Sequence, residues 1–197
     1  MMAKVCGLTT PEDVAMVLAS GADLLGFLHH PASPRHCQDP ALPALAGDRA
    51  VLVMVGEDAR DMAARARACG ATWVQPYLPG RAGLEILRAA GLRILLPWPD
   101  EAGQVPTPAD LYLWETGAKA TGLLGGSGVG HAMVHPPPGP FLLGGGLRGD
   151  VVAERHGALP TFPECLGFDA ASRLERSPGR KDASLVGAFV RAAHGLE

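Results

Sequence analysis

The stretch AVLVMVGEDARDMAARARACGATWVQPY, residues 50–77, contains the repeating unit from which the rest of the fold is predicted. Its first seven and last six residues are almost continuously apolar, which is typical of short strands covered on both faces. Residues 57–70 have the pattern of a helix and end in glycine, a common C-terminal stop. The stretch therefore predicts a strand, a helix and a second strand, which is the unit of a parallel sheet.

The same alternation extends toward both ends of the chain. Six further short apolar runs predict strands at 3–8, 22–28, 92–98, 111–116, 140–146 and 165–170. Four further helices are expected at 11–21, 80–91, 149–157 and 182–195. Thr10 is a candidate N-cap for the first of these helices, with Pro11 in its first turn and Gly21 as its stop. Three connections lack a full helical pattern: the one that contains 39–47, and those at 99–109 and 117–139.

Eight strands that alternate with helices predict one (β/α)8 TIM barrel with some short or missing helices. No change in composition marks a linker, so residues 1–197 are expected to form a single domain. An open doubly wound sheet is the alternative, but such a sheet usually needs only five or six strands.

Composition argues against several classes of protein. The 197 residues are 47% hydrophobic and 19% charged, with a formal net charge of −3. Such an apolar fraction excludes a disordered chain, and singly scattered lysines and arginines argue against nucleic-acid or membrane-surface partners. No apolar run approaches the roughly 18 residues of a membrane span, and the first residues lack the pattern of a signal peptide. We therefore expect a cytoplasmic protein, and a monomer is the expected form.

The predicted barrel indicates where functional residues lie. Catalytic groups belong at the carboxyl ends of the strands, and phosphate tends to lie over the loops after strands seven and eight. The residues at those positions are Cys6, Arg35, Glu115, Gly144 to Gly146, Asp169, Ala171, Ser172 and Arg173. Because side chains alternate along a strand, Lys4 and Cys6 share one face, as do Leu113 and Glu115.

Each candidate also has an ordinary structural explanation. A free cysteine such as Cys6 is most often a small buried hydrophobic side chain, and Glu115 alone is most often a solvated strand end. Their joint placement with Arg35 and Asp169 around one rim favours a functional site.

A metal site is not expected. The four cysteines, at 6, 37, 69 and 165, form no CxxC pair. Metal-binding residue types do cluster in the chain, at His29, His30, His36 and Cys37. Their spacing matches no closed zinc site, so a polar loop is the favoured interpretation.

The motifs of the chain resemble those of the phosphoribosylanthranilate isomerase family, in the same order and over nearly the whole length. The N-terminal motifs are KVCGLT (4–9), PED (11–13), GAD (21–23), GF (26–27) and SPR (33–35). The later motifs are VQ (74–75), GGSG (125–128), GGL (145–147), FD (168–169), Ser172, Glu175 and SPGRKD (177–182).

This resemblance implies a cofactor-independent Amadori rearrangement of N-(5-phosphoribosyl)anthranilate, a step of tryptophan biosynthesis. Cys6 would be the general base, and Lys4 on the same strand face would favour its thiolate. Glu115 aligns with the general acid of the family. Arg35 and Asp169 match residues that contact the substrate. The phosphate would lie on backbone amides near Gly145, Gly146, Ser172 and Arg173.

The chain departs from the family pattern at several functional loops. The acid is Glu115 where the family has Asp, and Tyr77 stands where the family has His. Residues 129–133 differ after the GGSG loop, and the Ser-Ser-Gly phosphate turn is replaced by ASR (171–173). The alternative hypothesis is therefore a diverged barrel that binds a phosphorylated ligand with weak or no catalysis.

Overall fold

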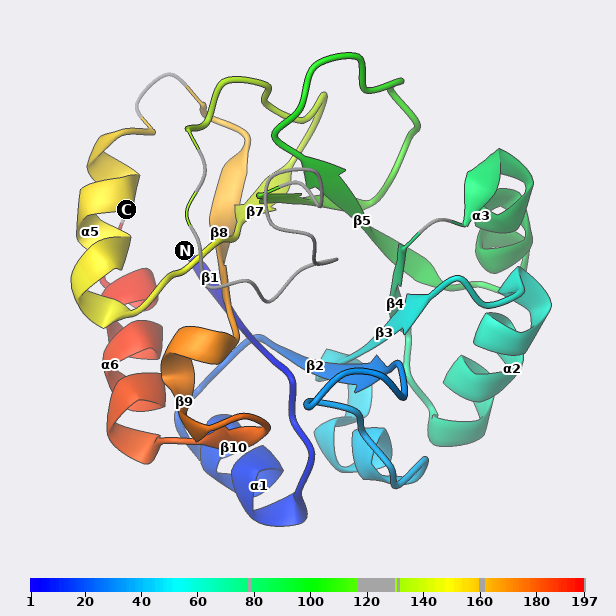
Figure 1. Cartoon of the computed structure of the whole chain (residues 1–197), viewed down its shortest axis with the longest axis horizontal. Helices are drawn as coiled ribbons and strands as arrows, with labels where there is room; N and C mark the ends of the chain where they lie inside the picture. The colour runs from blue at the N-terminus through cyan, green and yellow to red at the C-terminus, as the bar shows by residue number, and fades with distance from the viewer. Residues whose placement is uncertain (78, 117–129, 131, 160–161, 197) are drawn as a thin grey trace.

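The computed structural model describes residues 1–77, 79–116, 130, 132–159 and 162–196. Eight parallel strands close into a barrel in chain order, and the eighth strand pairs with the first (Figure 1). The strands are β1 Met2–Cys6, β2 Leu24–His29, β3 Ala50–Val55, β4 Trp73–Tyr77, β5 Arg93–Pro99, β6 Leu111–Glu115, β7 Phe141–Leu143 and β8 Cys165–Ala170. All eight predicted strands are present, which confirms the TIM barrel and excludes the open sheet.

Helices surround the barrel on its outer side (Figure 1). They are α1 Pro11–Ala19, α2 Ala59–Cys69, α3 Gly80–Ala89, α5 Gly149–Gly157 and α6 Ala183–His194. The 3-10 helix η1 Leu42–Arg49 lies between β2 and β3, and residues 100–110 join β5 to β6 without a helix. The short or missing helices are thus confirmed at these two connections, whereas most of 117–139 lies outside the described residues.

The helix ends follow from local sequence. Thr10 accepts a hydrogen bond from the Asp13 amide, and Pro11 occupies the first turn of α1, as expected. Asp58 caps α2 in the same way, and Gly70 ends that helix in the left-handed conformation at φ 72°. Asp182 accepts hydrogen bonds from two amides at the start of α6.

The barrel interior is apolar at its amino-terminal end. Side chains from the first half or the middle of six strands pack there in one cluster: Leu24, Val51, Trp73, Leu95, Leu111, Leu113 and Leu142. A larger apolar cluster fills the layer between strands and helices. The polar side chains Lys4, Gln75 and Glu115 are also buried, and each comes from the same inward face of its strand. The barrel is therefore closed to ligands at one end and polar toward the other.

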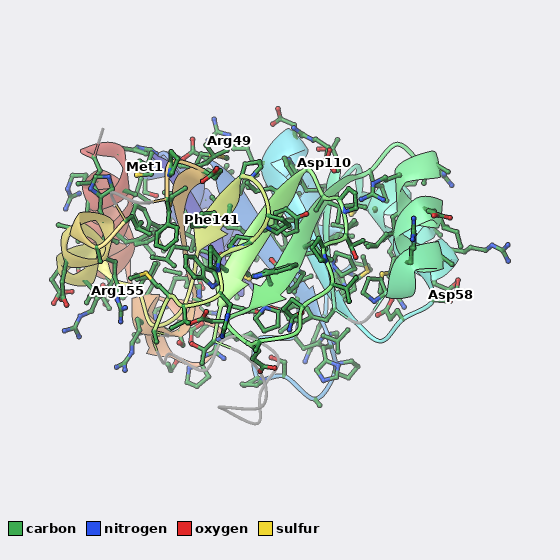
Figure 2. All side chains as sticks on the ribbon, turned by 90° about the horizontal axis from the view of Figure 1, so that it is seen from above. Met1, Arg49, Asp58, Asp110, Phe141 and Arg155 are labelled. Atoms are coloured by element: carbon green, nitrogen blue, oxygen red, sulfur yellow. The ribbon has the colours of Figure 1, made fainter. Side chains whose placement is uncertain are left out.

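Figure 2 shows at which edge of the barrel the strands begin. Met1, Arg49 and Asp110 each directly precede a strand, and all three lie along the upper edge of that view. The carboxyl ends of the parallel strands therefore face the opposite edge.

Beyond β8 the chain adds the 3-10 helix η2 Ser172–Leu174 and a hairpin of β9 Glu175–Ser177 with β10 Arg180–Lys181, which the sequence did not predict. Among the described helices, none combines the length and apolar character required to span a membrane.

Candidate active site

A cavity of about 530 Å³ opens at the carboxyl ends of the strands. Four residues predicted from the strand ends line it together: Cys6, Arg35, Glu115 and Asp169. Leu28, Val53, Val55 and Leu113 contribute apolar walls, and Gln75 and Tyr77 add polar groups from β4. A pocket of this size, apolar with a few convergent polar groups, is typical of a small-molecule site.

A smaller hollow of about 30 Å³ adjoins the cavity and shares Glu115 and Asp169 with it. The other predicted residues line this hollow: Gly145, Gly146, Ser172 and Arg173. Gly145 and Gly146 have positive φ angles of 93° and 67°, a conformation that side-chain-bearing residues rarely adopt. The structure thus brings to one region the eight residues to which the family resemblance assigns catalysis or substrate binding, divided between two adjoining hollows.

Cys6 lies at the end of β1 beside two buried cations. Lys4 Nζ is 2.6 Å from Asp169 Oδ1, and this carboxylate raises the pKa of Lys4 although burial opposes the rise. Burial raises the pKa of the Cys6 thiol, and Asp169 adds to the rise, whereas Lys4 and Lys181 lower it. The expectation that Lys4 favours the thiolate is therefore correct in direction, but desolvation outweighs it and the pKa of Cys6 is raised.

Gly26 leaves the space that the Cys6 thiol occupies. The two residues are partners in the β1–β2 register. A Cβ atom added at Gly26 would lie 2.5 Å from Cys6 Sγ, well inside van der Waals contact. The glycine at this position of β2 is thus explained by the close approach of the thiol.

Glu115 ends β6 with its side chain buried against the cavity. Burial raises its pKa from 4.5 to about 7, and the Asp169 carboxylate adds to the rise. Two groups oppose it, since the Tyr77 hydroxyl donates a hydrogen bond of 2.8 Å to Glu115 Oε1 and Lys4 is positively charged. A carboxyl with a pKa near neutrality is suited to give up a proton at physiological pH.

Arg35 lines the cavity, but an internal carboxylate already holds its guanidinium. Nε contacts both oxygens of Glu175, at 2.9 and 3.1 Å, and Nη2 contacts Oε2 at 2.9 Å. Lys181 Nζ lies 2.8 Å from Glu175 Oε1 and also donates to the Ala171 carbonyl. This buried network, which depends on the β9–β10 hairpin, fixes the orientation of Arg35.

Sequence reasoning gave no role to Tyr77, Gln75, Glu175 or Lys181. Tyr77 was noted only as a departure from a family motif, although it lies two residues after Gln75, which places both side chains on one face of β4. Glu175 and Lys181 were noted only as parts of family motifs, because a charged run of this kind ordinarily indicates a solvated surface.

Of the histidine cluster noted in the sequence, His30 lines the 530 Å³ cavity, whereas His29, His36 and Cys37 do not. His29 is buried and lies edge to face with His36, with ring centroids 6.4 Å apart. Among the residues that the structure describes, no group of three or more His, Cys, Asp or Glu could hold a metal ion. The GGSG motif at 125–128 lies outside the described residues.

Comparison with curated proteins finds similar sequences over almost the whole chain. The N-(5'-phosphoribosyl)anthranilate isomerase of Myxococcus xanthus is 35% identical over 214 residues, with 98% of this chain and 96% of that protein covered. The protein of the same name from Rhodopseudomonas palustris strain BisB18 is 32% identical, with 98% and 95% covered. No model of a known protein family matches the chain.

Solved structures give the same result for the fold. TrpF from Jonesia denitrificans superposes with a TM-score of 0.78 at 30% identity, covering 99% of this chain and 97% of that chain. Phosphoribosyl anthranilate isomerase from Thermus thermophilus superposes with a TM-score of 0.83 over 100% of both chains. Its identity is 22%, so that likeness concerns the fold alone.

Proposed function

This chain belongs to the N-(5'-phosphoribosyl)anthranilate isomerase family, and we infer that it is an isomerase of tryptophan biosynthesis. Its reaction converts N-(5'-phosphoribosyl)anthranilate to 1-(2-carboxyphenylamino)-1-deoxyribulose 5-phosphate. The observation that carries this inference is that a thiol, Cys6, and a carboxyl of raised pKa, Glu115, line the same cavity. An aldose-to-ketose rearrangement needs one group that takes a proton and another that gives one.

The two groups have complementary roles in the reaction. Glu115 in its protonated form donates to the ring oxygen of the ribose, and the ring opens to a Schiff base. The thiolate of Cys6 removes the C2′ proton, and the resulting enolamine relaxes to the ketone. The cationic Schiff base favours the thiolate during this step, because an opposite charge lowers the pKa of a thiol. No cofactor enters the reaction.

The remaining residues bind the two ends of the substrate. The apolar walls of the cavity suit the anthranilate ring. Arg35 makes its three hydrogen bonds to Glu175 through Nε and Nη2, so we assign its remaining nitrogen, Nη1, to the substrate. Asp169 keeps its place at the cavity through Lys4. The phosphate is assigned to the adjoining hollow, where glycine backbone and the Arg173 guanidinium supply donors.

We further propose that the chain acts as a cytoplasmic monomer formed by a single domain, without nucleic-acid or membrane partners. The monomer is supported by the small number of large apolar side chains that the described residues expose: Leu45, Val105, Val134, Leu166 and Leu185. Light scattering coupled to gel filtration tests this, and a dimer mass at micromolar concentration would contradict it.

Genetic complementation tests the function. The wild-type gene is expected to restore growth of a tryptophan auxotroph that lacks this isomerase, and the Cys6→Ser variant is the matched control. Failure of the folded wild-type protein to support growth would favour the alternative of a non-catalytic, phosphate-binding barrel.

A further inference from the structure

Tyr77 lies between a buried amide and the carboxyl of Glu115. Its hydroxyl accepts a hydrogen bond of 3.1 Å from Gln75 Nε2 and donates one of 2.8 Å to Glu115 Oε1. The ring is buried, and all three side chains line the 530 Å³ cavity. Because β4 and β6 are separated by β5 in the barrel, this chain of hydrogen bonds crosses the interior rather than following one pair of strands.

The direction of these hydrogen bonds fixes the positions of the protons. A tyrosine hydroxyl carries one proton, and burial together with the Glu115 charge raises the pKa of Tyr77 well above 10, so the proton stays on the oxygen. The Gln75 amide already donates to this oxygen, so the hydroxyl proton is directed at Glu115 Oε1. Oε1 is therefore an acceptor, and the proton of the neutral carboxyl belongs on Oε2.

We propose that Tyr77, oriented by Gln75, is a positioning residue that holds the transferable proton of Glu115 on Oε2, facing the substrate. The proposal rests on the function assigned to this site. A glutamate side chain has three rotatable bonds, and it is ordered for proton transfer only when its far end is anchored. The Tyr77 hydroxyl is the anchor that the described contacts provide.

The Tyr77→Phe variant removes this hydroxyl and keeps the ring. Tyr112→Phe is the matched control, because the Tyr112 hydroxyl donates to the Thr107 carbonyl and Tyr112 lines neither hollow of the site. Loss of the hydrogen bond raises the pKa of Glu115, since the bond favours the charged carboxylate. A higher pKa alone enlarges the fraction of enzyme with Glu115 protonated. A fall in kcat therefore does not come from a smaller protonated fraction of Glu115.

We expect Tyr77→Phe to lower kcat about tenfold, with KM changed less than twofold, while Tyr112→Phe keeps wild-type values. The active form has Glu115 protonated and Cys6 deprotonated. Because the pKa of the Cys6 base lies above that of the acid, the fraction of this form, and with it kcat/KM, rises with pH up to the pKa of Glu115 and then levels off. The midpoint of this rise, the acid limb of the profile, is expected near pH 7 in the wild type and at higher pH in Tyr77→Phe. A kcat within twofold of wild type and an unmoved limb would overturn the proposal.

A titration that does not depend on catalysis separates this proposal from the assigned function. With ¹³C-labelled glutamate, the Glu115 signal is identified by its loss in Glu115→Gln and followed against pH. An upward shift of its midpoint in Tyr77→Phe supports the hydrogen bond even if the wild type has no isomerase activity, in which case the assigned function fails alone. An unchanged midpoint overturns the proposal.

Gln75→Leu provides a second test if Tyr77→Phe folds poorly. Leucine has a similar volume but no donor, so the Tyr77 hydroxyl stays and loses its orienting partner. We expect a loss of kcat in the same direction but smaller than in Tyr77→Phe, with KM near the wild-type value. Wild-type kcat in this variant would mean that Gln75 does not orient Tyr77, and the proposal would fail.

Discussion

Shortening the acid at position 115 tests whether the site is built around glutamate. In Glu115→Asp the carboxyl moves back by one carbon–carbon bond, roughly 1.5 Å. The contact between Tyr77 Oη and Glu115 Oε1 is 2.8 Å, so its replacement lies at about 4 Å, beyond hydrogen-bond reach. The proton then lies about an ångström or more from its position in the wild type. Misplacement of this size typically lowers turnover on the order of 10²-fold.

The assay is steady-state turnover at several pH values, with Glu115→Gln as the second variant. Glutamine keeps the length of the side chain but cannot give up a proton, so kcat is expected to fall by ~10²–10⁴-fold. Intrinsic acidity does not explain a loss in Glu115→Asp, because the ordinary pKa values of the two side chains in water differ by only about 0.4. An increase of kcat in Glu115→Asp would mean that the native acid is misplaced. Equal turnover in all three forms would exclude Glu115 as the acid.

Three further variants and one pH dependence test separate parts of the site. Cys6→Ser should lower kcat by ~10²–10⁴-fold with a melting temperature close to that of the wild type; wild-type turnover would exclude Cys6 as the base. Gly26→Ala should displace the thiol and destabilise the fold by ~1–3 kcal/mol, measured by urea unfolding and kcat; an unaffected kcat would contradict the close contact. Inorganic phosphate should raise the melting temperature, and Arg173→Ala should reduce that gain, whereas an equal gain in both would exclude Arg173 as a ligand. Because the folded pKa of Glu115 is raised from 4.5 to about 7, the wild type should lose about 3 kcal/mol between those pH values relative to Glu115→Gln, and parallel stability curves would contradict the shift.

The strands were predictable because burial on both faces leaves a direct trace in the sequence. Each of β1 to β8 overlaps a short apolar run, and the strand ends identified Cys6, Glu115 and Asp169 without any contact information. Interior and exterior positions also followed from alternation, as the shared face of Lys4 and Cys6 illustrates.

Contacts across the barrel could not be predicted in this way. Tyr77 meets Glu115 only after β4, β5 and β6 have taken their register, because the two side chains come from strands that do not pair. The pairing of Arg35 with Glu175 likewise joins residues 140 positions apart through a hairpin with no apolar pattern. Burial raises the pKa of Cys6 only because the barrel is closed around the thiol. The sequence showed the nearby Lys4 but not this burial, so it gave an incomplete account of the pKa of Cys6.

The central claim is that this barrel catalyses the rearrangement with Cys6 as base and Glu115 as acid. Proton NMR of the purified wild-type protein with freshly formed N-(5'-phosphoribosyl)anthranilate tests it most directly. The anomeric proton of the substrate should disappear as the C1 methylene of the deoxyribulose product appears, at a rate that Cys6→Ser and Glu115→Gln both reduce by ~10²-fold or more. A folded wild-type protein that binds phosphate but converts the substrate no faster than the buffer would contradict the account.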